Sequence, residues 1–450
     1  MRSSRSKVIL SVAILVVGIL ATVLFAMIPS PTESSGMVVD FGDRQTLYTE
    51  AGPDEHPVSA LSRACGSWGF ELVVEGGTVV SIDGTANGDG GTWGLYAVAH
   101  GARDWTRLGS DPASHSISDY TVVCWGYCAP GELPTRAVDS TGVCFYGLDV
   151  PSRVVSMAPS CTEIVCAVDG GTWRLVGTDM YSNYPEDVVR GHGDGSISII
   201  GGYTNPSFET IMRQEPDLVI GVGDQNMHVG VAGKLRAAGI DVIIMDGGED
   251  VDTVLDNIFS VGVALGTESD AVNLVGSIRT SMDAVSDVLG SQPYMTDVDV
   301  MVSLSAVKSP WVSGSNTYVS DVVSDMHMHN VYSGESGWVQ VNSETLLRCN
   351  PSVIIIASTD YEATQSDYDA LISSLSPEWR GTDAYRTGEI YLFTGDSCDL
   401  LSRPGPRVAQ MSELLARVVH GGAFDDGITV PKVIGDGYAD YLTVTKEGSL

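Results

Sequence analysis

The chain has 450 residues, which is enough for two or three domains with large buried cores. Its 57 acidic and 24 basic residues give a net charge of −33 with histidine neutral. That charge argues against nucleic acid or an anionic lipid surface as a partner of the folded part. With 51 glycines and 7% aromatic residues, the composition is that of a globular protein rather than a disordered one.

The first 36 residues predict a membrane anchor followed by a short linker. Arg2, Arg5 and Lys7 precede an apolar stretch without charge over residues 8–28. A helix of that length spans the hydrocarbon core, with its positively charged end on the cytoplasmic side. The stretch is longer than an ordinary signal-peptide core, and the first cysteine, Cys65, lies too far along the chain to mark a lipoprotein site. We therefore predict an uncleaved signal anchor, or a cleaved signal as the alternative, and an extracytoplasmic body.

Residues 37–150 predict a small all-β domain of sandwich or barrel type. Short β-forming runs are broken by glycine, and no helical period is convincing. The runs are 70–75, 78–82, 93–99, 120–127 and 142–147. Their aromatic pairs, Trp93 with Tyr96 and Trp125 with Tyr127, favour a core over a ligand cage. The stretches 91–96 and 119–127 resemble the small β domains that end transcobalamin-like proteins.

The chain has eight cysteines, four before residue 150 and four after it. Even numbers in each half of an extracytoplasmic protein suggest disulfides, whose pairing the sequence leaves open. Cys124 and Cys128 are separated by three residues, but no second such pair and no histidine cluster accompany them. Zinc is therefore the lesser alternative.

After Pro151, β-strands alternate with helices, and this alternation predicts parallel sheets. The expected strands are 153–158, 175–178, 218–222, 242–245, 298–304, 353–357 and 390–393. Between the two blocks of strands, apolar residues at spacings of three and four predict one helix over 268–290, about 34 Å long at 1.5 Å per residue. A helix over 407–419 closes the second block, and residues 425–450 form a tail with little periodicity.

A fifteen-residue stretch occurs twice, as Ser207–Gly221 and as Asn342–Ile356. The copies agree at four positions: Glu209 with Glu344, Thr210 with Thr345, Arg213 with Arg348, and Pro216 with Pro351. Each copy predicts a capped helix, a proline that ends it, and a buried parallel strand. Two matched units predict two matched α/β lobes, and coincidence within one α/β domain is the alternative.

Three features then carry a family resemblance. Arg153–Glu163 opens the region, Val176–Pro185 follows, and the two repeat copies come after them. Together they resemble the substrate-binding proteins of ABC importers for vitamin B12, haem and ferric siderophores, and the Tyr-Ser-x-Tyr-Pro segment at 181–185 is most similar to the vitamin B12 (corrinoid) binders. The resemblance implies a first lobe over 151–265, a bridging helix over 266–290 and a second lobe over 291–424, with ligand held between the lobes.

The resemblance also implies the site residues. Ligand-binding residues would be Tyr181 and Tyr203 on the first lobe, Trp311 and Trp338 on the second, and Asp396 and Arg403 in a polar loop. Flat rings suit a corrin or porphyrin. Glu209 and Glu344 would dock onto arginines of a two-fold permease, because a carboxylate in the first helical turn is a fixed acceptor for guanidinium. Simple stabilisation of the helix ends is the alternative for both glutamates.

The sequence departs from the corrinoid binders at two places. Val222 stands where another aromatic residue is expected, and Met326-His-Met-His329 replaces a Gly-Gly pair. Methionine and imidazole so close together could ligate a metal centre, but turn formation is the commoner reason for such a segment.

These observations predict a monomeric, membrane-anchored protein that delivers a corrinoid to an ABC importer permease and its ATPase, without a cofactor of its own. A haem or ferric-siderophore binder of the same class is the alternative. No nucleophile-elbow, phosphate-loop or zinc-protease motif is present, which disfavours an enzyme. A surface scaffold that acts through the β domain is the remaining hypothesis.

Overall fold

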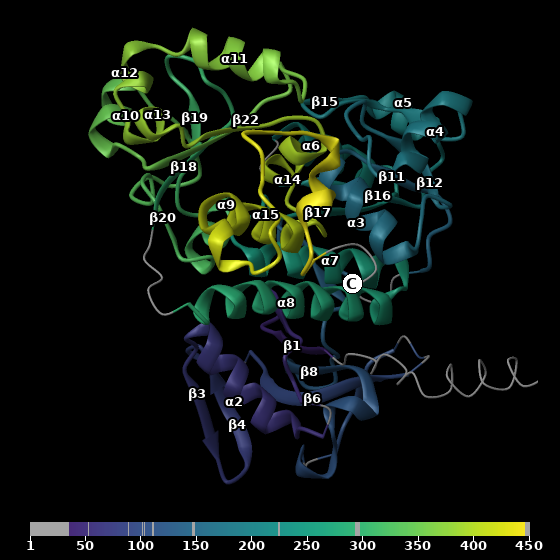
Figure 1. The fold of residues 1–450 in the computed structure, drawn as a ribbon. Coiled ribbons are helices and arrows are strands. Elements are labelled where there is room, and N and C mark those ends of the chain that lie inside the picture. Colours follow the sequence, from purple (N-terminus) through teal and green to yellow (C-terminus); the bar gives the residue numbers. More distant parts are fainter. Residues whose placement is uncertain are drawn as a thin grey trace, which may run out of the picture.

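The computed structural model describes residues 36–445, apart from positions 53, 89, 101, 103, 110–111, 146–148, 224–225 and 293–297. The predicted membrane anchor at residues 8–28 lies outside the described residues. Within the described part, every helix is too short or too polar to cross a bilayer. The chain forms a small N-terminal domain below a long helix, and two α/β lobes above that helix (Figure 1).

The N-terminal domain is built on a five-stranded mixed sheet in the order β2-β1-β8-β6-β7. Its elements are β1 (Gly36–Asp40), β2 (Gln45–Tyr48), α2 (Pro57–Trp68), β3 (Leu72–Glu75), β4 (Thr78–Ile82), β5 (Thr85–Ala86), β6 (Thr92–Ala99), β7 (Thr106–Arg107), β8 (Tyr120–Cys128), β9 (Ala137–Val138) and β10 (Cys144–Phe145). Strand β1 runs parallel to β8, while β6 runs antiparallel to β8. Trp93, Tyr96 and Trp125 are buried in this domain, as the sequence predicted.

The expectation of an all-β domain is wrong, because helix α2 packs on this sheet. Pro57 stands in its first turn and Gly69 ends it in the left-handed conformation. The helix buries Ala60, Leu61 and Ala64. Two of these three residues are alanines, so the apolar face is narrow and the helical period of apolar residues is weak in the sequence.

The first lobe is a parallel sheet in the order β13-β12-β11-β16-β17. Its elements are β11 (Val154–Ser156), α3 (Pro159–Asp169), β12 (Leu175–Thr178), α4 (Glu186–Asp194), β13 (Ser198–Ile199), β14 (Gly201–Gly202), β15 (Asn205–Pro206), α5 (Phe208–Met212), β16 (Leu218–Val222), α6 (Asn226–Ala237), β17 (Asp241–Met245) and α7 (Val251–Leu265). The chain moves outward from β11 in one direction and then returns to build β16 on its other side. Between β11 and β16 lies the position where open α/β sheets hold ligands at the carboxyl ends of their strands.

The second lobe is a mixed sheet in the order β21-β19-β18-β22-β23-β24, with β20 also paired to β18. Its elements are β18 (Val298–Ser303), β19 (Trp311–Ser313), α9 (Tyr318–Asp325), β20 (Met328–Asn330), β21 (Trp338–Gln340), α10 (Ser343–Cys349), β22 (Val353–Ala357), α11 (Gln365–Ser374), α12 (Pro377–Arg380), α13 (Asp383–Thr387), β23 (Ile390–Phe393), α14 (Asp396–Ser402), α15 (Val408–His420) and β24 (Val433–Ile434). Strands β18, β22, β23 and β24 are parallel to one another.

Helix α8 (Glu268–Gly290) is the predicted bridging helix, and it has the predicted ends. Its buried face carries Val272, Val275, Ile278 and Val285 at spacings of three, three and seven. The helix passes beneath both lobes and above the N-terminal domain (Figure 1). It therefore gives the three parts of the molecule one shared support.

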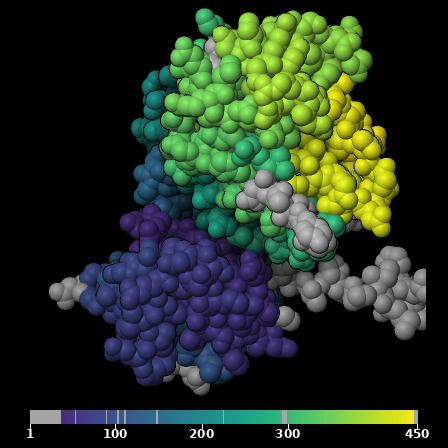
Figure 2. Space-filling model, turned by 60° about the vertical axis from the view of Figure 1, so that its left-hand side comes forward, coloured from purple at the N-terminus to yellow at the C-terminus, as the bar shows by residue number. Residues whose placement is uncertain are grey.

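Residues 425–445, the described part of the stretch predicted to form a tail, pack on the second lobe. Strand β24 pairs with β23 and extends the sheet. Beyond it, the backbone N–H groups of Thr443, Val444 and Thr445 donate hydrogen bonds to the buried carboxylate of Glu413 at 2.7–3.1 Å. Figure 2 shows this segment, in yellow, lying along the flank of the green second lobe. Periodicity could not reveal it, because its contacts are to distant residues and it has hardly any regular structure.

The two repeat copies fold alike. Ser207 caps α5 through the Thr210 N–H, and Asn342 caps α10 through the Thr345 N–H. In each copy, the residue before the repeated proline has positive φ: Glu215 at 48° and Asn350 at 44°. Each copy then enters a five-residue buried strand, β16 or β22. Helix α5 is shorter than the two turns expected.

The N-terminal domain is bonded to the first lobe and to α8. Buried Arg136 forms an ion pair with Glu268 in the first turn of α8. The Leu47 N–H donates to Asp256 Oδ1 at 2.9 Å, and Arg236 pairs with buried Asp139. Buried contacts of this kind fix the domain in one orientation on the lobe.

The expected disulfides are not formed: no disulfide joins any of the eight cysteines, all of which lie in the described residues. Cys124 and Cys128 both lie on β8. Four residues along a strand span about 13 Å, too far for one disulfide or one zinc ion. Cys161 and Cys166 both lie on α3, where they are buried in the core.

Candidate functional site

A cavity of about 450 Å³ lies between the two lobes. The first lobe contributes Pro159 and Ser160 after β11, and Val222 at the end of β16. The second lobe contributes Thr359, which follows the carboxyl end of β22. The cavity therefore lies where the carboxyl ends of the parallel strands of the two sheets face each other.

Four of the six sequence-predicted ligand residues line this cavity: Tyr181, Tyr203, Trp338 and Arg403. Trp311 and Asp396 do not. Trp311 pairs with Gln340 and Trp338 pairs with Ser313 on the antiparallel strands β19 and β21, so the two tryptophans share a sheet face two residues apart. Trp311 stands farther along that face and is 48% exposed. Asp396 begins α14, where its backbone N–H donates to Asp436 Oδ1 at 3.0 Å.

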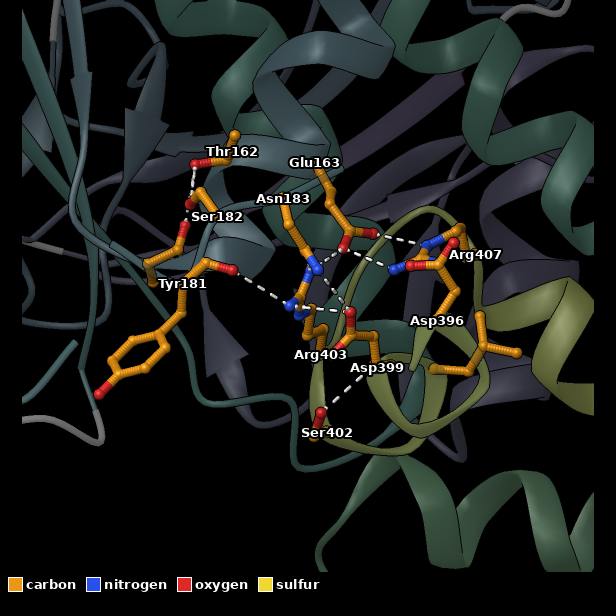
Figure 3. Close-up of polar contacts among 12 residues, drawn as sticks. Thr162, Glu163, Tyr181, Ser182, Asn183, Asp396, Asp399, Ser402, Arg403 and Arg407 are labelled. Atoms are coloured by element: carbon orange, nitrogen blue, oxygen red, sulfur yellow. Dashed lines mark hydrogen bonds and ion pairs between the residues drawn. The ribbon is translucent and has the colours of Figure 1, made fainter. Parts of the chain in front are cut away.

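Tyr181 is held in the cleft by the turn that carries it. The buried Asp179 carboxylate accepts the Tyr181 N–H at 2.9 Å and the Ser182 hydroxyl at 2.5 Å. The Ser182 hydroxyl also bonds Thr162 on α3 at 2.8 Å. This chain of bonds fixes the backbone, and Figure 3 shows the Tyr181 ring pointing away from the bonded residues. The Tyr181 side chain is 57% exposed.

Tyr203 rests on His228, a completely buried residue of α6. The ring Nε2 of His228 is 2.7 Å from the Tyr203 carbonyl, and its Nδ1 accepts the Val222 N–H at 3.2 Å. With Nδ1 an acceptor, Nε2 must carry the proton, so the imidazole is neutral. Burial lowers the pKa of His228 below its usual value, which agrees with the neutral form. One side chain thus positions two residues of the cleft.

Arg403 and Arg407 join the second lobe to the first through Glu163 of α3 (Figure 3). Arg407 donates two hydrogen bonds to the Glu163 carboxylate, at 2.7 and 2.8 Å, and Arg403 donates a third at 3.0 Å. Arg403 also pairs with Asp399 at 2.8 Å. The one cation that lines the cavity among the described residues is therefore already matched by two carboxylates.

Several residues of the site were not predicted from the sequence. Tyr318 of α9 lines the cavity with its ring, while its hydroxyl donates to the Leu400 carbonyl at 3.0 Å. Asp399 and Arg407 were not predicted either; Asp399 precedes the predicted Arg403 by four residues, and this spacing of opposite charges was the signal that could have revealed Asp399. Burial raises the pKa of Asp399 to about 6.

Gly248 allows the backbone of the first lobe to approach Pro404 and Tyr318 of the second lobe closely. Its φ is +81°, a conformation that favours glycine, and a Cβ there would lie 2.5 Å from the Pro404 side chain. Its carbonyl accepts the Tyr318 N–H at 2.9 Å. The first-lobe backbone therefore touches the second lobe directly under the cleft.

The Met326–His329 segment lies away from this cavity. Met326 and Met328 are buried in the hydrophobic core, and His327 has φ of 54°. His329 bonds Asp299 at 2.7 Å instead of a metal-ligating partner. Among the described residues, no group of three or more His, Cys, Asp or Glu could hold a metal ion.

Glu209 and Glu344 are both exposed, in the first turns of α5 and α10. In Figure 1 these helices lie at the top of the molecule, one on each lobe, opposite the N-terminal domain. Neither carboxylate makes an ion pair with any described residue. Both side chains are therefore accessible on the face that the N-terminal domain leaves open.

Comparison with known proteins agrees with this architecture. Residues 154–396 match the family model described as periplasmic binding protein. The chain is 24% identical over 277 residues to an uncharacterized ABC transporter substrate-binding lipoprotein, YvrC of Bacillus subtilis, covering 61% of this chain and 82% of that protein. It is 21% identical over 216 residues to a vitamin B12-binding protein of Pectobacterium atrosepticum, covering 48% of this chain and 74% of the relative.

Among solved structures, a periplasmic heme binding protein from Pseudomonas aeruginosa superimposes with a TM-score of 0.54 at 22% identity, over 63% of this chain and 97% of that one. This likeness shows the fold of the two lobes. The family match begins at residue 154, so residues 36–150 lie outside it.

Proposed function

Because the chain belongs to the periplasmic binding protein family, we propose that it captures a corrinoid between its lobes and delivers it to an ABC importer. The observation that carries this proposal is the convergence of Tyr181, Tyr203 and Trp338, from both lobes, on one cavity. Aromatic rings on two sides suit a broad, flat macrocycle, which is buried best against flat apolar surfaces.

The charges of the cleft support a corrinoid over haem. Haem carries two carboxylates, which require cations or several donors to replace their water. Arg403 is already paired with Glu163 and Asp399, so a haem carboxylate would have to displace an existing carboxylate. The periphery of a corrinoid carries neutral amides, which need no such exchange.

Haem or a ferric siderophore is the second candidate ligand, and one observation favours it. The Tyr181 side chain is exposed in the cleft, and tyrosine oxygen is one of the axial ligands that proteins use for haem iron. The two candidate ligands therefore require different groups in the cleft. An iron-containing ligand would bind through the phenol oxygen of Tyr181, whereas a corrinoid would stack on the aromatic faces.

Delivery requires an importer-facing surface, and we place it at Glu209 and Glu344. They occupy equivalent positions of the two lobes, so they could each meet one subunit of a two-fold permease. The membrane anchor predicted at residues 8–28 would keep the protein at the outer surface of the same membrane.

A ligand panel tests the proposal. The purified full chain is titrated with hydroxocobalamin, dicyanocobinamide and haemin, with tryptophan fluorescence and visible absorbance as readouts. We expect both corrinoids to bind and to quench Trp338, and haemin to bind far more weakly. Binding of haemin alone, with a new absorption band from tyrosine ligation, would replace the corrinoid by haem. Replacing Trp173, which is 66% exposed and outside the cleft, by phenylalanine provides the control for fluorescence changes unrelated to the site.

A further inference from the structure

The cavity lined by Tyr181, Tyr203 and Trp338, which we call the aromatic cavity, adjoins a second cavity of about 430 Å³, since Gly247 and Trp338 line both. The lining of the second cavity is acidic and polar, whereas that of the first includes several aromatic side chains. Its walls carry Asp246, Glu249 and Asn316, and Trp338 is the one aromatic side chain among the described residues that line it. We call this second cavity the polar pocket.

One wall of the polar pocket comes from the N-terminal domain. Ser140 and Thr141, at the tip of the β9–β10 hairpin, line it. Buried Asp139 fixes this tip: Oδ1 accepts the N–H groups of Thr141 and Val143, both at 3.0 Å, and Oδ2 accepts the Ile244 N–H at 3.1 Å. The Ser140 N–H in turn donates to the Ile244 carbonyl at 2.8 Å.

The tip therefore forms hydrogen bonds with both the backbone N–H and the backbone carbonyl of Ile244 in β17, the edge strand of the first lobe. Ser140 also packs against Gly223, where a Cβ would lie 2.5 Å from the serine Oγ. Gly223 follows Val222, a residue of the aromatic cavity. A side chain at position 141 is consequently held at a fixed place beside the ligand cleft.

Asp246 gives the polar pocket its chemistry. Asn257 holds its backbone at both ends, since Asn257 Oδ1 accepts the Asp246 N–H at 3.0 Å and Nδ2 donates to the Asp246 carbonyl at 3.2 Å. No described residue donates a hydrogen bond to the Asp246 carboxylate, which is half-buried. Burial, together with Glu249 and Asp139, raises its pKa to about 6. The pocket thus offers hydrogen-bond acceptors that lack donors.

We propose that the N-terminal domain is part of the ligand site, and that the polar pocket between Thr141 and Asp246 accepts hydrogen bonds from amide N–H groups at the periphery of the bound ligand. The aromatic cavity holds the ring, and the polar pocket selects neutral, donor-bearing substituents over carboxylates. Carboxylate substituents are repelled because Asp246 and Glu249 line the pocket and no cation is among its described lining residues. This inference rests on the proposed corrinoid function.

Two corrinoids with the same ring but different side groups test whether the polar pocket prefers amides to carboxylates, independently of whether the chain binds a corrinoid ring. Cobinamide carries primary amides at its periphery, and cobyrinic acid carries carboxylates at the same positions. At pH 7.5 we expect Asp246→Asn to improve binding of cobyrinic acid relative to cobinamide about tenfold, because one like-charge repulsion is removed. We expect Thr141→Trp to weaken cobinamide at least about tenfold by filling the pocket from the N-terminal side.

Thr78→Trp is the matched control, because Thr78 is an exposed threonine of the same domain on β4, outside both cavities. Thermal unfolding of each variant verifies that the fold is retained. If the wild-type chain binds neither corrinoid, the proposed function fails and this inference fails with it. If it binds cobinamide, and Thr141→Trp binds as tightly as Thr78→Trp while Asp246→Asn leaves the preference unchanged, the N-terminal domain is not part of the site although the corrinoid function stands.

Discussion

The two lobes contain the same repeated unit but protect the open edges of their sheets with different parts of the chain. In the first lobe, β17 is the edge strand, and the N-terminal domain covers it through Asp139 and Ser140. In the second lobe, β23 would be an edge, and the lobe's own C-terminal segment covers it with β24. An uncovered edge strand invites pairing with another chain, so both coverings have the same physical purpose.

This difference separates what local sequence determines from what distant contacts determine. Each repeat unit forms from its own cap, its own proline and its own apolar run, so the units are alike. The edges depend on residues far away in the sequence, so they are free to differ. The first lobe thereby acquires a neighbour whose residues Ser140 and Thr141 line the polar pocket, whereas the second lobe acquires only a longer sheet.

The largest effect on transport is expected from the repeated units, at Glu209 in the first lobe and Glu344 in the second. Changing Glu209 and Glu344 together to arginine should abolish ligand uptake and ligand-stimulated ATPase activity of the importer, since both subunit contacts would become repulsive. Each single change should cause a similar partial loss, because the two positions are equivalent. Corrinoid affinity should be unchanged.

Glu132→Arg with Glu362→Arg is the control for the change of net charge, since both of these glutamates are exposed and lie outside the repeats. Normal uptake by the Glu209/Glu344 double variant, with a loss of stability of about 0.3–1 kcal/mol for each site, would mean that the two glutamates only stabilise their helix ends.

The next effect concerns the bond between the lobes. Glu163→Gln removes the charge that two arginines share, and it should lower the free energy of unfolding by about 3–5 kcal/mol, as expected when one partner of a buried ion pair is lost. Urea unfolding measures the change. Glu75→Gln, at an exposed position of β3, should stay within about 0.5 kcal/mol of wild type. A loss of less than about 1 kcal/mol for Glu163→Gln would show that this cluster does not hold the lobes together.

A smaller effect should distinguish the two tryptophans of the second lobe. Trp338→Ala should weaken corrinoid binding by about 1–3 kcal/mol, by analogy with the loss of a stacked aromatic ring in nucleic-acid complexes. Trp311→Ala should bind within about twofold of wild type, because Trp311 does not line the cavity. Calorimetry with cobinamide measures both variants, and equal losses would mean that the ligand extends along the shared sheet face as far as Trp311.

The smallest effect is a dependence on pH from His228 beneath Tyr203. Because burial lowers the pKa of this histidine in the folded state, its neutral form contributes full stability above the unfolded-state pKa of about 6.5. That contribution is lost as the pH falls from there through the folded-state pKa. His228→Asn keeps an acceptor for the Val222 N–H but does not titrate. Its free energy of unfolding should therefore fall less between pH 7.5 and 5.5 than that of wild type, and parallel pH profiles would contradict this assignment.

Much of the fold was predictable because its signals are local. Strands β16, β22 and β23 are unbroken apolar runs, and α8 carries a regular apolar face over its whole length, so their ends agree with the sequence prediction. Helix α2 was missed because its buried face consists mostly of small residues, with Leu61 as the one large aliphatic side chain. The C-terminal segment was missed because Glu413, which organises it, lies in α15 and shows no pattern that points to residues 443–445.

The candidate site was predicted in part for the same reason. Tyr181, Tyr203, Trp338 and Arg403 belong to segments with a family resemblance, and the structure brings them to one cavity. The separation of Trp311 from Trp338 depends on the register of β19 against β21, which no local pattern reveals. The roles of Glu163 and His228 depend on contacts with the opposite lobe or a neighbouring strand.

The covering of β17 also has a consequence for the order in which the protein can be completed during synthesis. Asp139 precedes Ile244 by 105 residues, so at about 5–20 residues per second the N-terminal hairpin exists for roughly 5–20 s before its partner strand is made. Glu413, by contrast, precedes Thr445 by 32 residues, at the end of the described chain. The first-lobe edge therefore emerges towards a surface that is already present, whereas in the second lobe Leu392 of β23 is made 41 residues before Val433 of its covering strand β24.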